Sequence, residues 1–197
     1  NNSVNSSGKV EDQLVRLANG ESSCGSVLLK PDQGEEGSWT MTRLTPESYP
    51  LVVEKIYYYL GHGKADDGNI DCNAGLAHSV MVFKQIETVP SSDPQLLATI
   101  EIDSLESSNI SDEGRDLMVN LPEPIVMQQD EHLFVAVQLN GEHPSVMCIT
   151  VDVEGDSEPD RNFWSSSNQS PFDWVQLDSF GLSGDIVISA FGQIEEQ

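Results

Sequence analysis

The sequence predicts an all-β protein, an antiparallel β-sandwich of jelly-roll type, and three observations lead to this fold class. Apolar and polar residues alternate over many short segments, which are rich in β-branched and aromatic residues, as half-buried strands are. Clusters of Gly, Pro, Asp and Ser separate these segments at fairly even intervals, which is typical of sandwiches and jelly rolls. The chain has 197 residues, a length at which a single all-β domain buries a substantial core.

Nine segments have the composition and the alternation of strands. In one of them Leu133, Val135 and Val137 share a face, and Asn140-Gly141 then favours a tight turn. The expected strands are residues 39–44, 51–60, 78–86, 96–102, 116–121, 124–127, 132–139, 146–153 and 185–191.

The start of the chain differs from the rest. Residues 1–8 are rich in Asn and Ser, so we expect a flexible tail or linker over residues 1–20. Within it, residues 10–17 are the one segment expected to form a helical turn. Residues 21–197 are then expected to form a single sandwich domain.

The charge of the chain limits its partners. It has 33 Asp and Glu residues against 9 Lys and Arg, a formal net charge of −24. Nucleic acids and anionic membrane surfaces repel such a protein, and no apolar run is long enough to span a bilayer. We therefore expect neither nucleic-acid binding nor membrane insertion. The acidity fits a secreted or cell-surface protein that works in salt or among divalent cations.

Three cysteines, Cys24, Cys72 and Cys148, allow one disulfide and one free thiol. No CxxC spacing is present, so a zinc knuckle or a thioredoxin-type site is not expected. We expect one disulfide in which Cys72 pairs with Cys148 or with Cys24. Three reduced cysteines are the alternative.

Four short motifs carry a resemblance to a known group of domains. Residues 43–50 read RLTPESYP, residues 124–127 PIVM, residues 133–137 LFVAV and residues 184–190 GDIVISA. They resemble the motifs R-F-x-P-x-x-Y-P, P-I-x-V, F-x-V-G-I and G-D/N-x-x-I-R-A of a β-sandwich accessory domain found in secreted bacterial proteins. The resemblance covers residues 37–193 and implies a sandwich fold and an exported location.

The chain departs from this pattern in three places. Leu44 replaces the aromatic residue, Ser189 replaces the arginine of the closing motif, and residues 61–73 read as an insertion. The resemblance carries no catalytic residue over to this chain.

One segment has the composition of a sugar-binding site. Trp164, Phe172 and Trp174 lie close together in the sequence, and Asn168 stands between them with further Ser and Gln residues. Aromatic faces beside side-chain amides suit a carbohydrate, so these four residues are the candidate ligand-binding residues. The alternative is that the aromatic side chains close one end of the sandwich.

Two acidic segments are candidate calcium sites. Asp67, Asn69 and Asp71 alternate in a tight loop, and carboxylate and amide oxygens of this kind suit Ca²⁺. Asp152 and Asp156 belong to a second run of acids at every other position, where a cation would relieve the repulsion between like charges. The alternative for both segments is a solvated, salt-screened surface.

No catalytic motif is present: there is no Gly-x-Ser-x-Gly elbow, and the four histidines show no HExxH spacing. We therefore expect a non-catalytic extracellular binding or adhesion module, Ca²⁺-stabilised and carbohydrate-binding, whose partner is a glycan or a cell-surface protein. The first alternative is a surface-layer or filament subunit that self-associates through β-strand pairing. The second is a secreted hydrolase with an unrecognised site.

Overall fold

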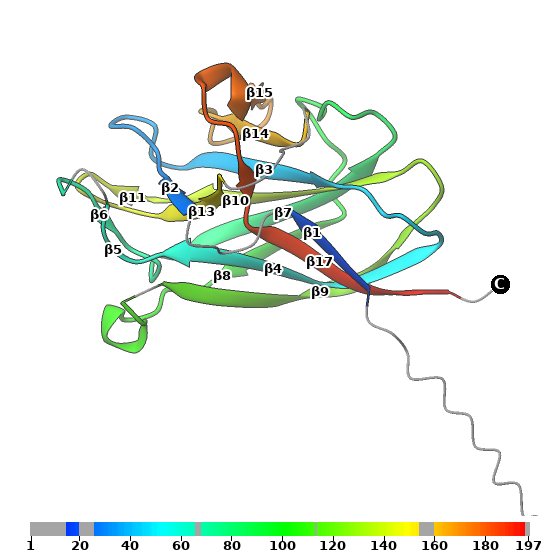
Figure 1. Ribbon diagram of the computed structural model, residues 1–197, viewed down its shortest axis with the longest axis horizontal. Helices are drawn as coiled ribbons and strands as arrows, with labels where there is room; N and C mark the ends of the chain where they lie inside the picture. Colours follow the sequence, from blue (N-terminus) through cyan, green and yellow to red (C-terminus); the bar gives the residue numbers. More distant parts are fainter. Residues whose placement is uncertain (1–14, 20–25, 66–67, 113, 154–159, 196–197) are drawn as a thin grey trace, which may run out of the picture.

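A computed structural model of the chain describes residues 15–19, 26–65, 68–112, 114–153 and 160–195. Within these ranges the regular elements are β-strands and two short 3-10 turns, η1 (Ser107–Asn109) and η2 (Leu177–Phe180), and no α-helix is present. The antiparallel β-sandwich that the alternation predicts is confirmed, with two sheets lying face to face (Figure 1).

The first sheet holds seven strands, all paired antiparallel. β4 is its central strand, with β17 on one side and β9 on the other, and β1 extends the β17 side. β13 pairs with the end of β4 and with β2 and β16. The bounds are β1 Val15–Asn19, β2 Ser26–Leu29, β4 Leu51–Gly61, β9 Arg115–Met127, β13 Cys148–Asp152, β16 Asp185–Ile186 and β17 Ile188–Ile194.

The second sheet has six strands in the order β15-β14-β3-β10-β7-β8, also antiparallel. Their bounds are β3 Ser38–Leu44, β7 His78–Gln85, β8 Ala98–Ile102, β10 His132–Leu139, β14 Asn162–Ser165 and β15 Val175–Gln176. A small third sheet joins β5 (Gly63–Lys64), β6 (Asp71–Cys72), β11 (Gly141–Glu142) and β12 (Ser145–Val146) at one end of the molecule.

The main core lies between the two large sheets. The face of β10 that the alternation predicts, Leu133 through Leu139 at every second position, is fully buried there. Ile56, Tyr58 and Leu60 of β4 face it from the first sheet and are also fully buried. Burying such large side chains contributes roughly 1.5–3 kcal/mol each, so these two strands are the centre of the fold.

Several strands differ from the expectation, among them β9 and β1. We expected two strands over residues 116–127, but β9 is one strand that pairs with β4 along its whole length. The pairing continues across a register shift, since Asn120 lies opposite Lys55 and Ile125 lies opposite Val53. Pro122 and Pro124 lie within this bulge. Proline has no amide donor, and at a bulge this removes no hydrogen bond between the paired strands.

The expected helical turn is wrong in the part that the structure describes. Val15, Arg16 and Leu17 belong to β1, which pairs with β17 from Val15 to Asn19. Paired strand therefore begins inside the segment assigned to the tail, and residues 1–14 lie outside the described ranges.

Candidate functional site

The four candidate ligand-binding residues lie on two different sides of the second sheet. Trp164, on β14, packs into the core between the sheets and is 6% exposed. Phe172 and Trp174 pack instead with a second apolar cluster, on the outer face of the same sheet, and Asn168 is exposed. The sequence neighbours therefore do not form one aromatic site.

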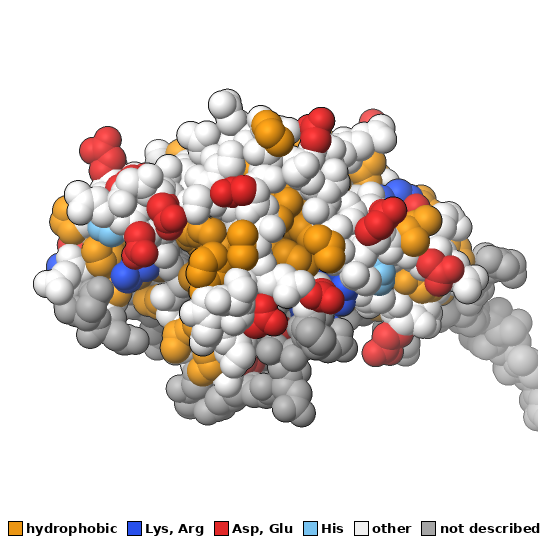
Figure 2. Space-filling view, turned by 90° about the horizontal axis from the view of Figure 1, so that it is seen from above, with side chains coloured by type: hydrophobic (Ala, Val, Ile, Leu, Met, Phe, Trp, Pro, Cys, Tyr) orange, Lys and Arg blue, Asp and Glu red, His pale blue; other side chains and the backbone are white. Residues whose placement is uncertain are grey.

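The outer face of the second sheet is an apolar layer of its own. Its buried members are Trp39, Met41, Met81, Phe83, Phe134, Ala136, Phe163 and Phe172. The rings of Phe83 and Phe134 stack with centroids 5.0 Å apart, and Phe172 meets Trp39 edge to face at 6.1 Å. Figure 2 looks onto this side, where hydrophobic side chains gather in the middle and acidic side chains surround them.

Residues 165–174 form a covering loop over part of this layer. The Trp174 indole Nε1 donates to the Ser91 carbonyl oxygen at 3.1 Å, and the Phe172 amide donates to the Ser92 carbonyl at 2.7 Å. The Trp39 indole donates to the Asn168 carbonyl oxygen at 3.2 Å. The polar atoms of both indoles thus hold the loop in place.

Asp173 fixes the shape of the covering loop. Its Oδ1 accepts hydrogen bonds from the Ser165 hydroxyl at 2.6 Å and from the Ser167 amide at 3.0 Å. These bonds stabilise the charged form, so they hold the pKa of the Asp173 carboxyl below its ordinary value.

A groove with a different composition opens beside Trp164, and we call it the Trp164 groove. Its volume is about 270 Å³, just below the range of about 300–1,000 Å³ for drug-sized ligand sites. Segments far apart in the chain line it, namely Leu29, Lys30, Asp32 and Glu35, then Trp164 and Ser166, and finally Leu177, Phe180 and Leu182.

Besides aromatic residues, the groove is lined by acidic, basic and hydroxyl-bearing residues. Phe180, the last residue of η2, is 63% exposed, and Gly181 ends that turn with φ 76°. The Ser166 hydroxyl donates to Glu35 Oε1 at 2.9 Å, and Lys30 and Asp32 also line the groove. An aromatic face takes the apolar side of a sugar ring, while carboxylate, ammonium and hydroxyl groups hydrogen-bond its hydroxyls. Of these residues, only Trp164 was among the candidates from the sequence.

Three of the five candidate calcium ligands, Asn69, Asp71 and Asp152, lie within the described residues. Asp71, on β6, forms an ion pair with Lys64 at 2.6 Å, and Asn69 is exposed. Asp152 ends β13 in the first sheet, opposite Asp185 of β16. Asp67 and Asp156 lie outside the described residues. Among the residues that the structure does describe, no group of three or more His, Cys, Asp or Glu side chains is placed to hold a metal ion.

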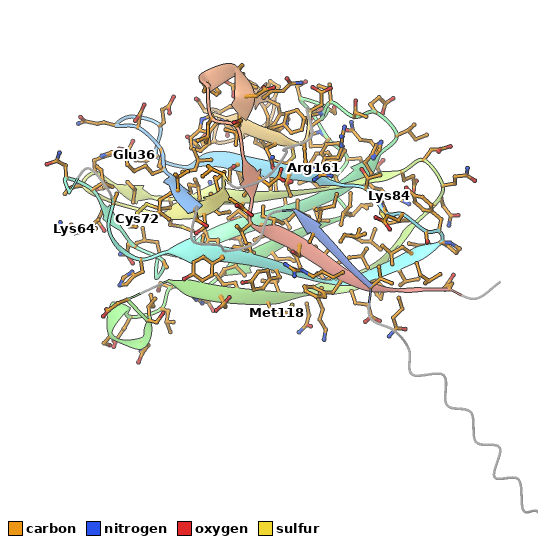
Figure 3. The ribbon with its side chains drawn as sticks, viewed as in Figure 1. Glu36, Lys64, Cys72, Lys84, Met118 and Arg161 are labelled. Carbon is orange, nitrogen blue, oxygen red and sulfur yellow. A yellow bond between two sulfur atoms is a disulfide. The ribbon has the colours of Figure 1, made fainter. Side chains whose placement is uncertain are left out.

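A disulfide joins Cys72 to Cys148, with Cα atoms 5.3 Å apart. It links β6 of the small sheet to β13 of the first sheet and is buried with Ala65, Ile70 and Val146. Figure 3 shows Cys72 and Lys64 at the same end of the molecule. Cys24, the other partner considered for Cys72, lies outside the described residues.

No protein-family model matches the chain, and no curated protein matches it. Among solved structures, the cysteine protease and lectin-like domains of Cwp84, a surface layer associated protein of Clostridium difficile, are similar. The identity is 9%, the TM-score 0.52, and the match covers 80% of this chain and 32% of that chain. A clostridial Cwp84 variant after propeptide cleavage gives 8% identity and a TM-score of 0.55, with 87% and 38% covered.

The chain thus spans about a third of the length of the proteins it is similar to. At 8–9% identity the likeness shows the fold alone. It agrees with the sandwich fold that the resemblance to accessory domains implies. In the described residues no helix has the length and apolar character needed to cross a membrane.

Proposed function

We propose that this chain is a non-catalytic cell-surface binding module that holds a saccharide in the Trp164 groove. The observation that carries the proposal is the composition of that groove. The exposed Phe180 and the buried Trp164 line one hollow of about 270 Å³ together with Asp32, Glu35, Lys30 and Ser166. Lectin-like neighbours from a surface layer associated protein support the extracellular location and the class of ligand.

The covering loop supports this choice of site over the one that the sequence indicated. Both indole donors there are engaged by backbone carbonyls, and Phe172 is only 7% exposed. These rings therefore close an apolar layer. In the Trp164 groove, by contrast, Phe180 presents its ring to solvent.

The experiment is a glycan array probed with the wild-type chain, followed by calorimetric titration of the best glycan. Phe180→Ala is expected to weaken binding about tenfold, which corresponds to about 1.4 kcal/mol, and Glu35→Gln is expected to weaken it as well. Met118→Ala is the matched control, since Met118 is 53% exposed on the other sheet, in β9. Binding that survives Phe180→Ala, or no binding on the array, would count against the proposal.

Calcium binding stays a prediction. A Ca²⁺ at Asn69 and Asp71 would share the Asp71 carboxylate with the Lys64 ammonium. Thermal unfolding in EDTA and in millimolar Ca²⁺ at matched ionic strength tests it, because an ion that binds only the folded state raises the midpoint.

One observation favours assembly through strand pairing as the second candidate. β9 pairs only with β4 among the described strands, and it exposes Met118 and Val126. Pro122 and Pro124 interrupt that edge, which limits its use as a template. Sedimentation at rising concentration decides it: a monomer throughout removes this candidate.

A further inference from the structure

The three tryptophans differ in how their indole N–H groups are used. The indoles of Trp39 and Trp174 donate to backbone carbonyl oxygens at 3.2 and 3.1 Å. In the part of the chain that the structure describes, the indole of Trp164 has no such acceptor, and its Nε1 is not among the atoms sealed from solvent without a partner. Buried indoles usually find a partner. Because Trp164 lines the Trp164 groove, this N–H is available to a ligand there.

Trp164 is held firmly in its position. Its strand, β14, pairs with β3 on one side and with β15 on the other, so that Trp164 lies opposite both Thr40 and Val175. The side chain is 6% exposed and packs with the main core. A ligand that offers an acceptor to this indole therefore meets a donor that is already ordered.

Glu35 supplies an acceptor in the same groove. The Glu35 amide donates to the Asp32 carbonyl oxygen, and the Ser38 amide donates to the Glu35 carbonyl oxygen, both at 3.0 Å, so the backbone here is fixed. Glu35 Oε1 accepts from the Ser166 hydroxyl at 2.9 Å. An ionised carboxylate has about four lone-pair sites, so Glu35 can accept a further hydrogen bond from a ligand.

Aliphatic side chains complete the lining of the groove. Leu29 and Leu182 are partly buried and pack against the main core, and both line the groove. Phe180, which also lines it, is exposed. A ligand that matches this lining carries a carbonyl-type acceptor, an N–H or O–H donor, a small apolar group and a ring face.

Resting on the saccharide site proposed above, we propose that the Trp164 groove selects a sugar with an acetamido group, an N-acetylhexosamine. The acetamido carbonyl oxygen accepts from Trp164 Nε1, and the acetamido N–H donates to the Glu35 carboxylate. The methyl group packs against Leu29 and Leu182, and the apolar side of the sugar ring packs on Phe180. A hydroxyl at the same ring carbon has no methyl group, and an ammonium offers no acceptor to the indole.

The test uses three tetrasaccharides with the same backbone that differ only in the group on the second ring carbon. Chitotetraose carries acetamido groups, cellotetraose hydroxyls, and the fully deacetylated chitosan tetramer ammonium groups. Calorimetric titration of the full chain is run in about 0.15 M NaCl, which screens distant charges. Chitotetraose is expected to bind about tenfold tighter than cellotetraose, and tighter than the deacetylated tetramer. The net charge of −24 alone would favour the cation and so predicts the reverse order.

Trp164→Phe removes the indole N–H and keeps an aromatic ring. It is expected to reduce the preference for chitotetraose over cellotetraose to less than about threefold. Trp174→Phe is the matched control, because the Trp174 indole is bound to the Ser91 carbonyl, and it is expected to keep the preference. Both variants are first checked by thermal unfolding. If Trp164→Phe does not fold, the wild-type indole NMR signals decide: chitotetraose is expected to shift the Trp164 indole proton and cellotetraose to shift it less.

The outcomes separate this inference from the saccharide site itself. Equal binding of chitotetraose and cellotetraose, tighter binding of the deacetylated tetramer, or an unchanged preference in Trp164→Phe would overturn the acetamido selectivity and leave a saccharide site in place. A glycan array that binds only sugars without acetamido groups would do the same. No binding of the three tetrasaccharides together with an array that binds nothing would overturn both.

Discussion

At the scale of single residues, Tyr58 and His78 form a polar pair inside the main core. The Tyr58 hydroxyl lies 2.6 Å from His78 Nε2, and both residues are almost fully buried. His78 Nδ1 lies 2.9 Å from the Leu76 carbonyl oxygen, so Nδ1 carries the proton, and Nε2 accepts the bond from Tyr58. Both side chains are thereby satisfied in their neutral forms. Burial raises the pKa of Tyr58 and lowers that of His78.

This pair predicts that stability falls with acid. Because the pKa of folded His78 is below its ordinary value of 6.5, the unfolded chain binds the proton more readily. The free energy of unfolding is then expected to fall as pH drops below about 6.5 and to level off below the folded pKa. Nearby Arg115 lowers this pKa further, and Glu101 raises it.

Urea unfolding at about pH 7.5 and about pH 5.5 measures the effect. The pH dependence is expected to shrink in His78→Gln, whatever that variant's stability. Burial also lowers the pKa of His132, so His132→Gln is the control that shows its share. An equal pH slope in wild type and His78→Gln would contradict the assignment.

At the scale of elements, the covering loop depends on Asp173. Asp173→Ala removes the acceptor of the bonds from Ser165 and Ser167. The expected cost is about 1–3 kcal/mol of unfolding free energy, together with easier acrylamide quenching of tryptophan fluorescence. Asp178→Ala, an exposed aspartate on η2, is the matched control. If both variants behave alike, the loop does not depend on the Asp173 carboxylate.

The disulfide holds the small sheet against the first sheet. Cys72 and Cys148 are 76 residues apart, so the bridge restricts the unfolded chain over a long loop. Replacing both by Ala is expected to lower the free energy of unfolding by about 2–4 kcal/mol. Cys24→Ser is the control, because it removes a thiol without touching this bridge. Three free thiols by mass spectrometry in the wild-type chain would show that the bridge does not form.

The strands that the sequence predicted best are the long central ones. In β7 and β10, alternate residues belong to the main core and to the apolar layer on the outer face of the second sheet. The alternation in the sequence therefore assigns each residue to its face. β2 and β14 are four residues each and carry too few alternating positions to be found. β1 depends on pairing with β17, more than 160 residues away, as the pair Val15–Gly192 shows. The alternation within a short segment does not predict which distant strand the segment pairs with.

The Trp164 groove could not be predicted from the sequence, because it too depends on contacts between distant segments. Glu35, Trp164 and Phe180 meet there only because the loop after β2, strand β14 and η2 come together. The sequence did single out Trp164, but it grouped that residue with Phe172 and Trp174. Alternation along β14 separates them, because Phe163 faces the outer layer while Trp164 faces the core.

At the scale of the whole molecule, the net charge of −24 on 197 residues opposes compactness. Raising NaCl shortens the screening length from about 30 Å at about 0.01 M to about 3 Å at about 1 M. We therefore expect the thermal unfolding midpoint to rise by several degrees over this range, as followed by circular dichroism. A midpoint that stays constant or falls with NaCl would mean that repulsion between the acidic side chains does not destabilise the folded chain.

The central claim is that the Trp164 groove is the binding site of a surface module. The most direct measurement is a titration of the ¹⁵N-labelled chain with the best array glycan, followed by amide and indole NMR shifts. The account predicts saturable shifts at the Trp164 indole and in residues 30–35 and 177–182. Shifts confined to the Trp174 indole and the covering loop, or none at saturating glycan, would contradict it.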